Sequence, residues 1–235
     1  MADFHELSVV IPVYNEAESL PTLINDWYDL FQLMEISFLM IVIDDGSNDE
    51  SQSILETIQK LKPNLSVVSH ANIGHGPSIY KGYLKGLTSE WVFQIDGDHQ
   101  FETKAFQDLW KNRANHDLLL AERESKQASI SRRMISSVSS HIIRAFFGEG
   151  IHDVNSPYRL IRTQPLQDAL KRIEPASFAP NLLISAYFVF TKKRIYTNRV
   201  GLRKVGVKNQ SRMSLYILKG CIQSILTVIK FRLSI

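Results

Sequence analysis

The feature that most constrains the fold is an alternation of short β-branched runs with amphipathic stretches along the first half of the chain. The candidate strands are residues 7–13, 37–44, 65–69, 91–95 and 117–121. After Ser19, which is able to cap a helix, apolar side chains recur at helical spacing from Leu20 to Phe31. This alternation predicts an α/β fold, in which a mostly parallel sheet is flanked by helices.

The remaining candidate elements alternate with these strands and continue beyond them. They are helices at 49–62, after the glycine-rich turn to residue 87, at 103–115, 129–147 and 181–192, with strands near 158–161 and 195–200. The last stretch carries an apolar stripe of Leu215, Leu218, Ile222, Ile225, Leu226 and Ile229. Lys219 and Lys230 fall opposite this stripe, so we expect a main domain over residues 1–212 and a basic amphipathic helix over 213–235.

Acidic and basic residues are unevenly distributed. All 24 Asp and Glu residues precede position 175, whereas 11 of the 27 Lys and Arg residues follow it. A terminal segment without carboxylates indicates an anionic partner, such as nucleic acid, anionic lipid or phosphate groups. Cys221 is the single cysteine, which excludes an intrachain disulfide and a zinc finger.

Targeting signals are not evident in the sequence. The first ten residues carry no basic run, and no stretch reaches the roughly 18 uncharged apolar residues of a membrane-spanning helix. We therefore expect a protein that faces the cytosol.

Polar clusters follow three of the candidate strands, at residues 12–16, 44–47 and 96–100. Ligands of parallel sheets bind beyond the carboxyl ends of the strands. Asp44 and Asp45 are suited to accept hydrogen bonds from a nucleobase and its ribose, with Tyr14 and Pro12 as an apolar wall. The alternative is a plain turn followed by a helix cap.

The third cluster carries two carboxylates one residue apart. Asp96 and Asp98 are suited to converge on a hard cation that also holds diphosphate oxygens, and Gly97 allows close approach of the ligand. The alternative is an Asp-Gly turn. Residues 72–77 are suited to cradle an anion on backbone N–H groups, but they lack the lysine and serine of a P-loop. His75 has no second histidine at ligand spacing and is interpreted as a loop residue.

The order of these motifs resembles one family. Residues 9–16, 44–47, 72–82 and 96–100 are similar to the successive signatures of family 2 glycosyltransferases, which have a GT-A type nucleotide-diphospho-sugar transferase domain. The resemblance covers about residues 6–212 and implies that 1–212 form the catalytic domain. It extends to the branch of polyprenyl-phosphate sugar synthases, which includes dolichol-phosphate mannose synthase.

The resemblance implies roles for individual residues. The implied nucleotide-sugar site consists of Pro12, Tyr14, Glu16, Asp44, Asp45, Gly76, Asp96 and Gly97. A divalent ion, Mg or Mn, is implied on Asp96, Asp98 and Gln100, where it stabilises the charge of the leaving diphosphate. The implied catalytic residues are Asp98, Arg123, Arg132 and Asp153, and the implied acceptor or phosphate ligands are Arg159, Arg203, Lys204 and Lys208. Lys208 stands where the family motif has serine.

These roles predict an inverting, metal-dependent transferase that moves a sugar from a UDP- or GDP-linked donor to a polyprenyl phosphate. A phosphate monoester is largely ionised at neutral pH and needs no general base. One alternative is transfer to a sugar hydroxyl in polysaccharide or lipopolysaccharide assembly, with Asp153 as the base. Another is a non-catalytic nucleotide- or anion-binding module. Nucleic acid is a poor candidate partner, because aromatic residues do not interleave with the basic loop.

The C-terminal features predict the cellular location. Basic side chains near an anionic leaflet, together with a stripe that lies in the interface, indicate a peripheral protein on the cytoplasmic face of the membrane. The alternative is that the stripe packs on the domain or forms a dimer contact. A membrane partner subunit is a further expectation.

Overall fold

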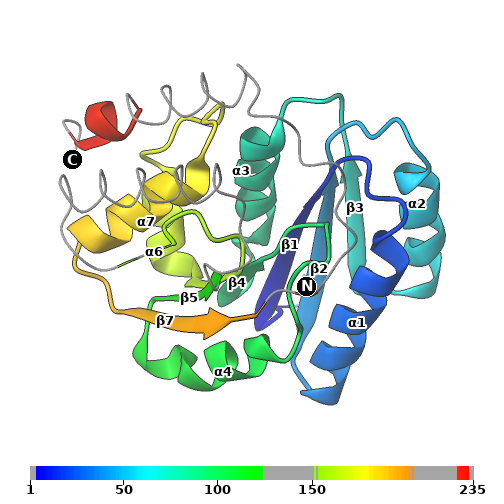
Figure 1. Ribbon diagram of the computed structural model, residues 1–235, viewed down its shortest axis with the longest axis horizontal. Coiled ribbons are helices and arrows are strands. Elements are labelled where there is room, and N and C mark those ends of the chain that lie inside the picture. Colours follow the sequence, from blue (N-terminus) through cyan, green and yellow to red (C-terminus); the bar gives the residue numbers. More distant parts are fainter. Residues whose placement is uncertain (1–3, 124–150, 152, 202, 204–226, 233–235) are drawn as a thin grey trace.

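The computed structural model describes residues 4–123, 151, 153–201, 203 and 227–232. They form a seven-stranded sheet in the order β3-β2-β1-β4-β6-β5-β7 (Figure 1). The strands are β1 (Leu7–Val13), β2 (Phe38–Asp44), β3 (Leu65–Ser69), β4 (Trp91–Gln94), β5 (Leu118–Arg123), β6 (Arg159–Arg162) and β7 (Ile195–Val200). All neighbours are parallel except β6, which is antiparallel to both β4 and β5. The predicted mostly parallel α/β fold is confirmed.

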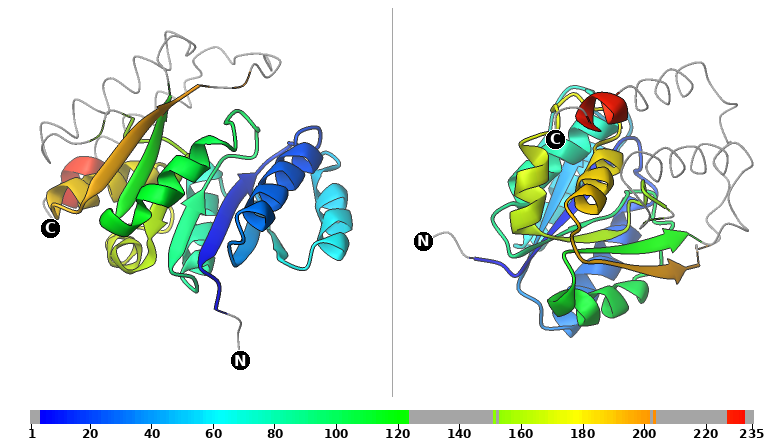
Figure 2. Two further views of the ribbon diagram at one scale, coloured as in Figure 1. Left: turned by 90° about the horizontal axis from the view of Figure 1, so that it is seen from below. Right: turned by 90° about the vertical axis from the view of Figure 1, so that its left-hand side faces the viewer.

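Helices cover both faces of the sheet. They are α1 (Leu20–Leu33), α2 (Ser51–Leu61), α3 (His75–Gly86), α4 (Ala105–Asn112), α6 (Thr163–Leu170) and α7 (Pro180–Phe190). One core cluster joins the sheet to α1, α2 and α4, and a second joins it to α3, α6 and α7 (Figure 2). Alternate residues of β1 divide between the two clusters, with Val9 in the first and Val10 in the second. The period of two in a strand thus builds a three-layer domain.

The elements differ from the predicted ones in a few places. The predicted helix at 103–115 is the shorter α4 followed by a 3-10 turn at Arg113–Asn115. Helix α6 was not predicted, although its Leu166 and Leu170 are buried in the second cluster. The predicted helix at 129–147 lies outside the described residues. Ser19 is at the N-cap of α1, but its hydroxyl accepts no capping hydrogen bond from the N–H groups of that helix.

The end of the predicted amphipathic helix packs on the domain. Residues 227–232 are helical, and Val228 (0% exposed) and Phe231 (4%) are buried in the second core cluster. The Arg232 guanidinium lies 4.6 Å from the centre of the Phe190 ring of α7. Ile229, which the stripe assigned to the apolar face, is only partly buried. Residues 227–232 therefore pack on the domain, as the alternative interpretation of the stripe expected.

Within the described ranges, no helix combines the length and apolar character that crossing a bilayer requires.

Replacing Phe231 tests the docking of this segment. Phe231→Ala should lower the free energy of unfolding by about 3 kcal/mol, because it removes a buried ring and leaves a cavity. Lys230→Ala is the control. Its ammonium pairs with Glu174 at 2.9 Å between exposed side chains, so the change should stay within about 0.5 kcal/mol. Urea denaturation measures both, and equal midpoints for the two variants would contradict the docking.

Candidate functional site

The predicted polar clusters meet at one edge of the sheet. β1 is parallel to both β2 and β4, so the loops that follow these three strands emerge side by side. The loop before α3 joins them from β3, the neighbour of β2. This edge therefore collects the residues that the sequence motifs singled out.

Side-chain hydrogen bonds tie the loops after β1 and β2 together. Ser47 Oγ accepts the backbone N–H of Asn15 at 3.0 Å, and Ser51 Oγ accepts that of Glu16 at 3.0 Å. In return Asn15 Oδ1 accepts the N–H of Asn48 at 2.8 Å. Asn15 has a φ of +56°, a conformation that asparagine tolerates better than most residues. The two loops thus behave as one unit.

The apolar wall expected for a base consists of one side chain. Tyr14 is 45% exposed, and its hydroxyl accepts a 3.4 Å hydrogen bond from Asn48 Nδ2. Pro12 is buried within β1, and its predicted contact with the base stays a prediction. Glu16 is partly buried beside the loop after β4, and its Oε2 accepts a hydrogen bond from the Ser19 hydroxyl at 3.3 Å. An open aromatic face is suited to stack on a nucleobase.

Both predicted base-binding carboxylates already accept protein N–H groups. Asp44, 1% exposed, accepts the N–H of Ser47 at 3.1 Å and its hydroxyl at 2.6 Å, which is the plain-turn alternative. Asp45, 2% exposed, accepts the N–H groups of Ile73 at 2.7 Å and Gly74 at 3.0 Å. Asp45 therefore anchors the loop before α3, and its contact with a base stays a prediction.

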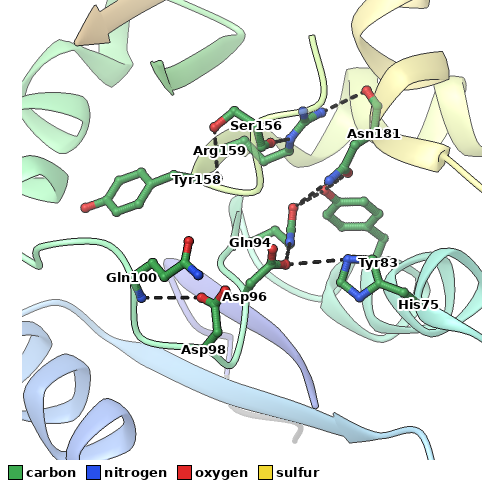
Figure 3. A network of polar contacts seen from close by, with 10 residues as sticks. All are labelled: His75, Tyr83, Gln94, Asp96, Asp98, Gln100, Ser156, Tyr158, Arg159 and Asn181. Atoms are coloured by element: carbon green, nitrogen blue, oxygen red, sulfur yellow. Dashed lines mark hydrogen bonds and ion pairs between the residues drawn. The ribbon is translucent and has the colours of Figure 1, made fainter. Parts of the chain in front are cut away.

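The predicted metal ligands lie in the loop after β4 (Figure 3). The Asp96 side chain is 27% exposed, and its Oδ1 accepts a hydrogen bond from Gln94 Nε2 at 3.1 Å. His75 Nε2, at the start of α3, lies 3.6 Å from the same oxygen. Asp98 Oδ1 accepts the N–H of Gln100 at 3.3 Å. His75 was predicted to be a loop residue, whereas it is the first residue of α3, and its proximity to Asp96 was not predicted.

This loop fits a hard divalent cation. Mg²⁺ and Mn²⁺ prefer oxygen ligands and commonly combine one or two carboxylates with water and substrate phosphates. Asp96 and Asp98 are partly exposed and supply such oxygens, and Gln100 adds an amide. Across the described part of the chain, no three His, Cys, Asp or Glu side chains gather to hold a metal. The predicted metal ligands are accordingly two carboxylates and one amide.

Arg203 holds this loop to α1. Its Nη1 donates to Asp26 Oδ2 at 3.0 Å and to His99 Nε2 at 2.8 Å, and its backbone N–H donates to the carbonyl of Gln100 at 2.8 Å. Burial and the nearby charge of Arg203 lower the pKa of His99, so its neutral ring accepts this bond. The guanidinium predicted to bind acceptor phosphate is thus engaged by a carboxylate, and its position indicates a structural role.

Arg159 is a buried arginine. It is 0% exposed and donates to the carbonyl oxygens of Ser156 at 2.7 Å, Val154 at 3.1 Å and Asn181 at 3.0 Å. These bonds indicate a structural role, and the predicted contact of Arg159 with acceptor phosphate stays a prediction. The chain before β6 and the start of α7 are joined by this side chain.

Two predicted ligand-contact glycines are required by packing. A Cβ on Gly76 would lie 2.3 Å from the Ser177 carbonyl oxygen and 2.4 Å from that of Phe178. A Cβ on Gly97 would lie 3.1 Å from the carbonyl oxygen of Pro12, and the Gly97 carbonyl accepts the Ser19 hydroxyl at 2.8 Å. A side chain at Gly76 would overlap backbone carbonyls and one at Gly97 would be crowded, while the predicted ligand contacts of both glycines stay predictions.

The remaining predicted residues are less informative. Asp153 is 9% exposed in a turn, where its carbonyl accepts the N–H of Ser156 at 3.1 Å. Arg123 ends β5. The side chain of Arg123, and all of Arg132, Lys204 and Lys208, lie outside the described residues.

Comparison with known proteins assigns the family. Residues 8–170 match the family model described as Glycosyl transferase family 2, which is well over half of the chain. The chain belongs to this family. Undecaprenyl-phosphate 4-deoxy-4-formamido-L-arabinose transferase of Enterobacter sp. (strain 638) is 29% identical over 76% of this chain and 55% of the relative. The Proteus mirabilis (strain HI4320) protein of the same name is 28% identical with the same coverage. The chain thus spans about half the length of these curated relatives.

Solved structures confirm the GT-A fold of this family 2 chain. Glucosyl-3-phosphoglycerate synthase from Mycobacterium tuberculosis, in complex with UDP, superposes with a TM-score of 0.67 at 18% identity, over 97% of this chain and 80% of that one. Mannosyltransferase PcManGT from Pyrobaculum calidifontis, in complex with GDP-Man and Mn²⁺, gives 0.68 at 13% identity, over 97% and 65%.

Gly76→Ala tests the packing role of this glycine. The substitution should lower the free energy of unfolding by about 1–3 kcal/mol, because the new methyl group overlaps two backbone carbonyls. Gly201→Ala is the control, since a Cβ there meets nothing within 4 Å and should change stability by less than about 0.5 kcal/mol. Denaturant titration supplies both values. Unchanged stability with weakened nucleotide binding would instead support the ligand-contact interpretation.

Proposed function

We propose that the protein is an inverting, divalent-metal-dependent glycosyltransferase that moves a sugar from a nucleoside diphosphate to a polyprenyl phosphate or a related membrane-linked acceptor. The observation that carries this proposal is the position of Asp96 and Asp98. They are partly exposed at the carboxyl end of β4, on the same edge of the sheet as Tyr14, within a family 2 chain.

The residues of this edge have distinct roles in the proposed reaction. Tyr14 offers its exposed ring to the base, and Asp45 holds the loop before α3 in place. Asp96 and Asp98, with Gln100, would hold the divalent ion, which neutralises charge on the leaving diphosphate. The acceptor oxygen attacks the sugar C1 as the bond from C1 to the diphosphate oxygen breaks, and the diphosphate leaves with the electron pair. A single displacement of this kind inverts the configuration at C1.

The environment of Asp153 favours a phosphate acceptor. A sugar hydroxyl must lose a proton during attack and calls for a positioned base, whereas a phosphate oxygen is already largely ionised at neutral pH. Asp153 is 9% exposed within a turn, which suits a structural residue better than a base. The names of the two curated relatives, which include undecaprenyl phosphate, support the same acceptor class.

The charge of the C-terminal segment supports peripheral membrane association on the cytoplasmic face. None of the 24 acidic residues lies after position 174, while 11 basic ones do. Attraction to an anionic leaflet contributes about 1 kcal/mol per basic residue held near it. A membrane partner subunit and transfer to a saccharide hydroxyl are the alternatives that the experiments below address.

Asp98→Ala tests the metal-dependent donor site. We expect the wild-type protein to show a melting temperature raised by a UDP- or GDP-sugar in the presence of Mn²⁺, because a ligand that binds the native state stabilises it. Asp98→Ala should lose the Mn²⁺-dependent part of the shift. Asp168→Ala is the control, since Asp168 pairs with exposed Lys171 at 3.1 Å on α6. A shift retained in Asp98→Ala would contradict the metal role.

The acceptor class is tested with radiolabelled donor and membranes that contain polyprenyl phosphate. The proposal predicts label in the organic-solvent extract, released by mild acid as free sugar, because a sugar joined to phosphate at C1 is acid-labile. Label recovered only in water-soluble saccharide would assign the acceptor to a hydroxyl instead. Heat-denatured protein supplies the background.

A further inference from the structure

A chain of buried polar side chains leads from α3 and α7 to Asp96 (Figure 3). Tyr83 on α3 is 0% exposed, Asn181 on α7 is 3% exposed, and Gln94, the last residue of β4, is 0% exposed. Tyr83 belongs to the second core cluster, so these groups lie in otherwise apolar surroundings. Burying an amide in such surroundings is unfavourable unless its polar atoms are hydrogen-bonded.

The hydrogen bonds that link these buried side chains all point toward Asp96. The Tyr83 hydroxyl donates to Asn181 Oδ1 at 2.7 Å, Asn181 Nδ2 donates to Gln94 Oε1 at 2.9 Å, and Gln94 Nε2 donates to Asp96 Oδ1 at 3.1 Å. Burial raises the pKa of Tyr83, which keeps its hydroxyl protonated as the first donor. Successive hydrogen bonds with aligned donors polarise one another, so the last donor is strengthened toward the carboxylate.

The buried Arg159 side chain anchors this series of hydrogen bonds at Asn181. Arg159 Nη1 donates to the backbone carbonyl of Asn181 at 3.0 Å, while Arg159 Nε donates to that of Ser156 at 2.7 Å. The Tyr83 hydroxyl oxygen also lies 3.3 Å from Gln94 Oε1, although its single proton is directed at the nearer Asn181 Oδ1. The Gln94 amide is thus held with its oxygen toward Asn181 and its nitrogen toward Asp96.

Only one oxygen of Asp96 takes part in these contacts. Gln94 and His75 both approach Oδ1, at 3.1 Å and 3.6 Å. Within the described part of the chain, no hydrogen bond reaches Oδ2. Among the described residues, the contacts of the Asp96 carboxylate are therefore all made by Oδ1.

We propose that Gln94, held by Asn181 and Tyr83, is a positioning residue that orients the Asp96 carboxylate for the divalent ion. This inference rests on the proposed function, because it assumes that Asp96 binds the ion. Partners that hold a metal ligand in place commonly change metal affinity by about 10–100-fold when they are removed. Gln94 differs from the metal ligands in that it contacts the ion only through Asp96.

The test is the affinity for Mn²⁺, titrated in the presence of UDP or GDP, whichever gives the Mn²⁺-dependent rise in melting temperature. Gln94→Leu should weaken Mn²⁺ binding by about 10–100-fold, and Tyr83→Phe, which removes one hydroxyl, by about 2–5-fold. Affinity for the metal-free nucleotide should be unchanged in both. Raising the Mn²⁺ concentration should restore kcat in Gln94→Leu but not in Asp96→Asn.

Tyr80→Phe is the matched control. Tyr80 lies on the same helix as Tyr83, but its hydroxyl donates to the Leu170 carbonyl at 3.2 Å, away from Asp96. This variant should bind Mn²⁺ with the same affinity as the wild type, because its hydroxyl lies outside the hydrogen bonds that lead to Asp96. Tyr83→Phe retains the buried ring, so the test stands even if Gln94→Leu does not fold.

The outcomes separate this inference from the function on which it rests. If Asp96→Asn loses Mn²⁺ binding while Tyr83→Phe and any folded Gln94→Leu bind it as the wild type does, the positioning role is overturned and the function stands. Lower thermal stability with unchanged Mn²⁺ affinity overturns the positioning role in the same way. If Asp96→Asn itself binds Mn²⁺ normally, the proposed metal-dependent function fails.

Discussion

The parallel pairing of β1 with β2 and β4 is the constraint on which the site depends. It brings the loops after three strands to one edge, where hydrogen bonds from Ser47 and Ser51 fasten two of them together. Arg203 fastens the third to Asp26 of α1. An edge of a sheet held by such cross-ties supplies a preorganised site, because the cost of ordering the loops is met during folding rather than on ligand binding.

The polar groups of this edge divide into those that face outward and those that hold the backbone. Tyr14 and the two carboxylates of the loop after β4 are exposed in part, whereas Asp44, Asp45 and Arg159 are buried and bonded to protein. Buried charges require such partners, since an unpaired charge in the interior is strongly unfavourable. The surroundings of Asp96 combine both kinds, with an open carboxylate supported from behind by the buried Gln94 amide.

Much of the fold was predictable from local pattern. The strands at 7–13 and 65–69 match β1 and β3 residue for residue, because short runs rich in β-branched residues are distinctive. The reversed direction of β6 was not predicted, since strand direction leaves no periodic signal. Helix α6 was missed although Leu166, Ala169 and Leu170 recur at helical spacing. The motifs predicted the edge of the sheet at which these residues gather, but the protein contacts of Pro12, Gly76 and Arg159 were not predicted.

The sequence by itself determined the alternating strands and helices, the family motifs and the edge of the sheet at which they gather, because these depend on residues near one another in the chain. Only the tertiary structure decided which polar side chains are hydrogen-bonded to other protein groups and which are exposed to solvent. Gln94 and Asn181 are 87 residues apart and Arg203 and Asp26 are 177 apart, and local sequence carries no record of such contacts. Hydrogen-bond partners are a property of the packed chain, since a donor is satisfied by whatever acceptor the fold brings within reach.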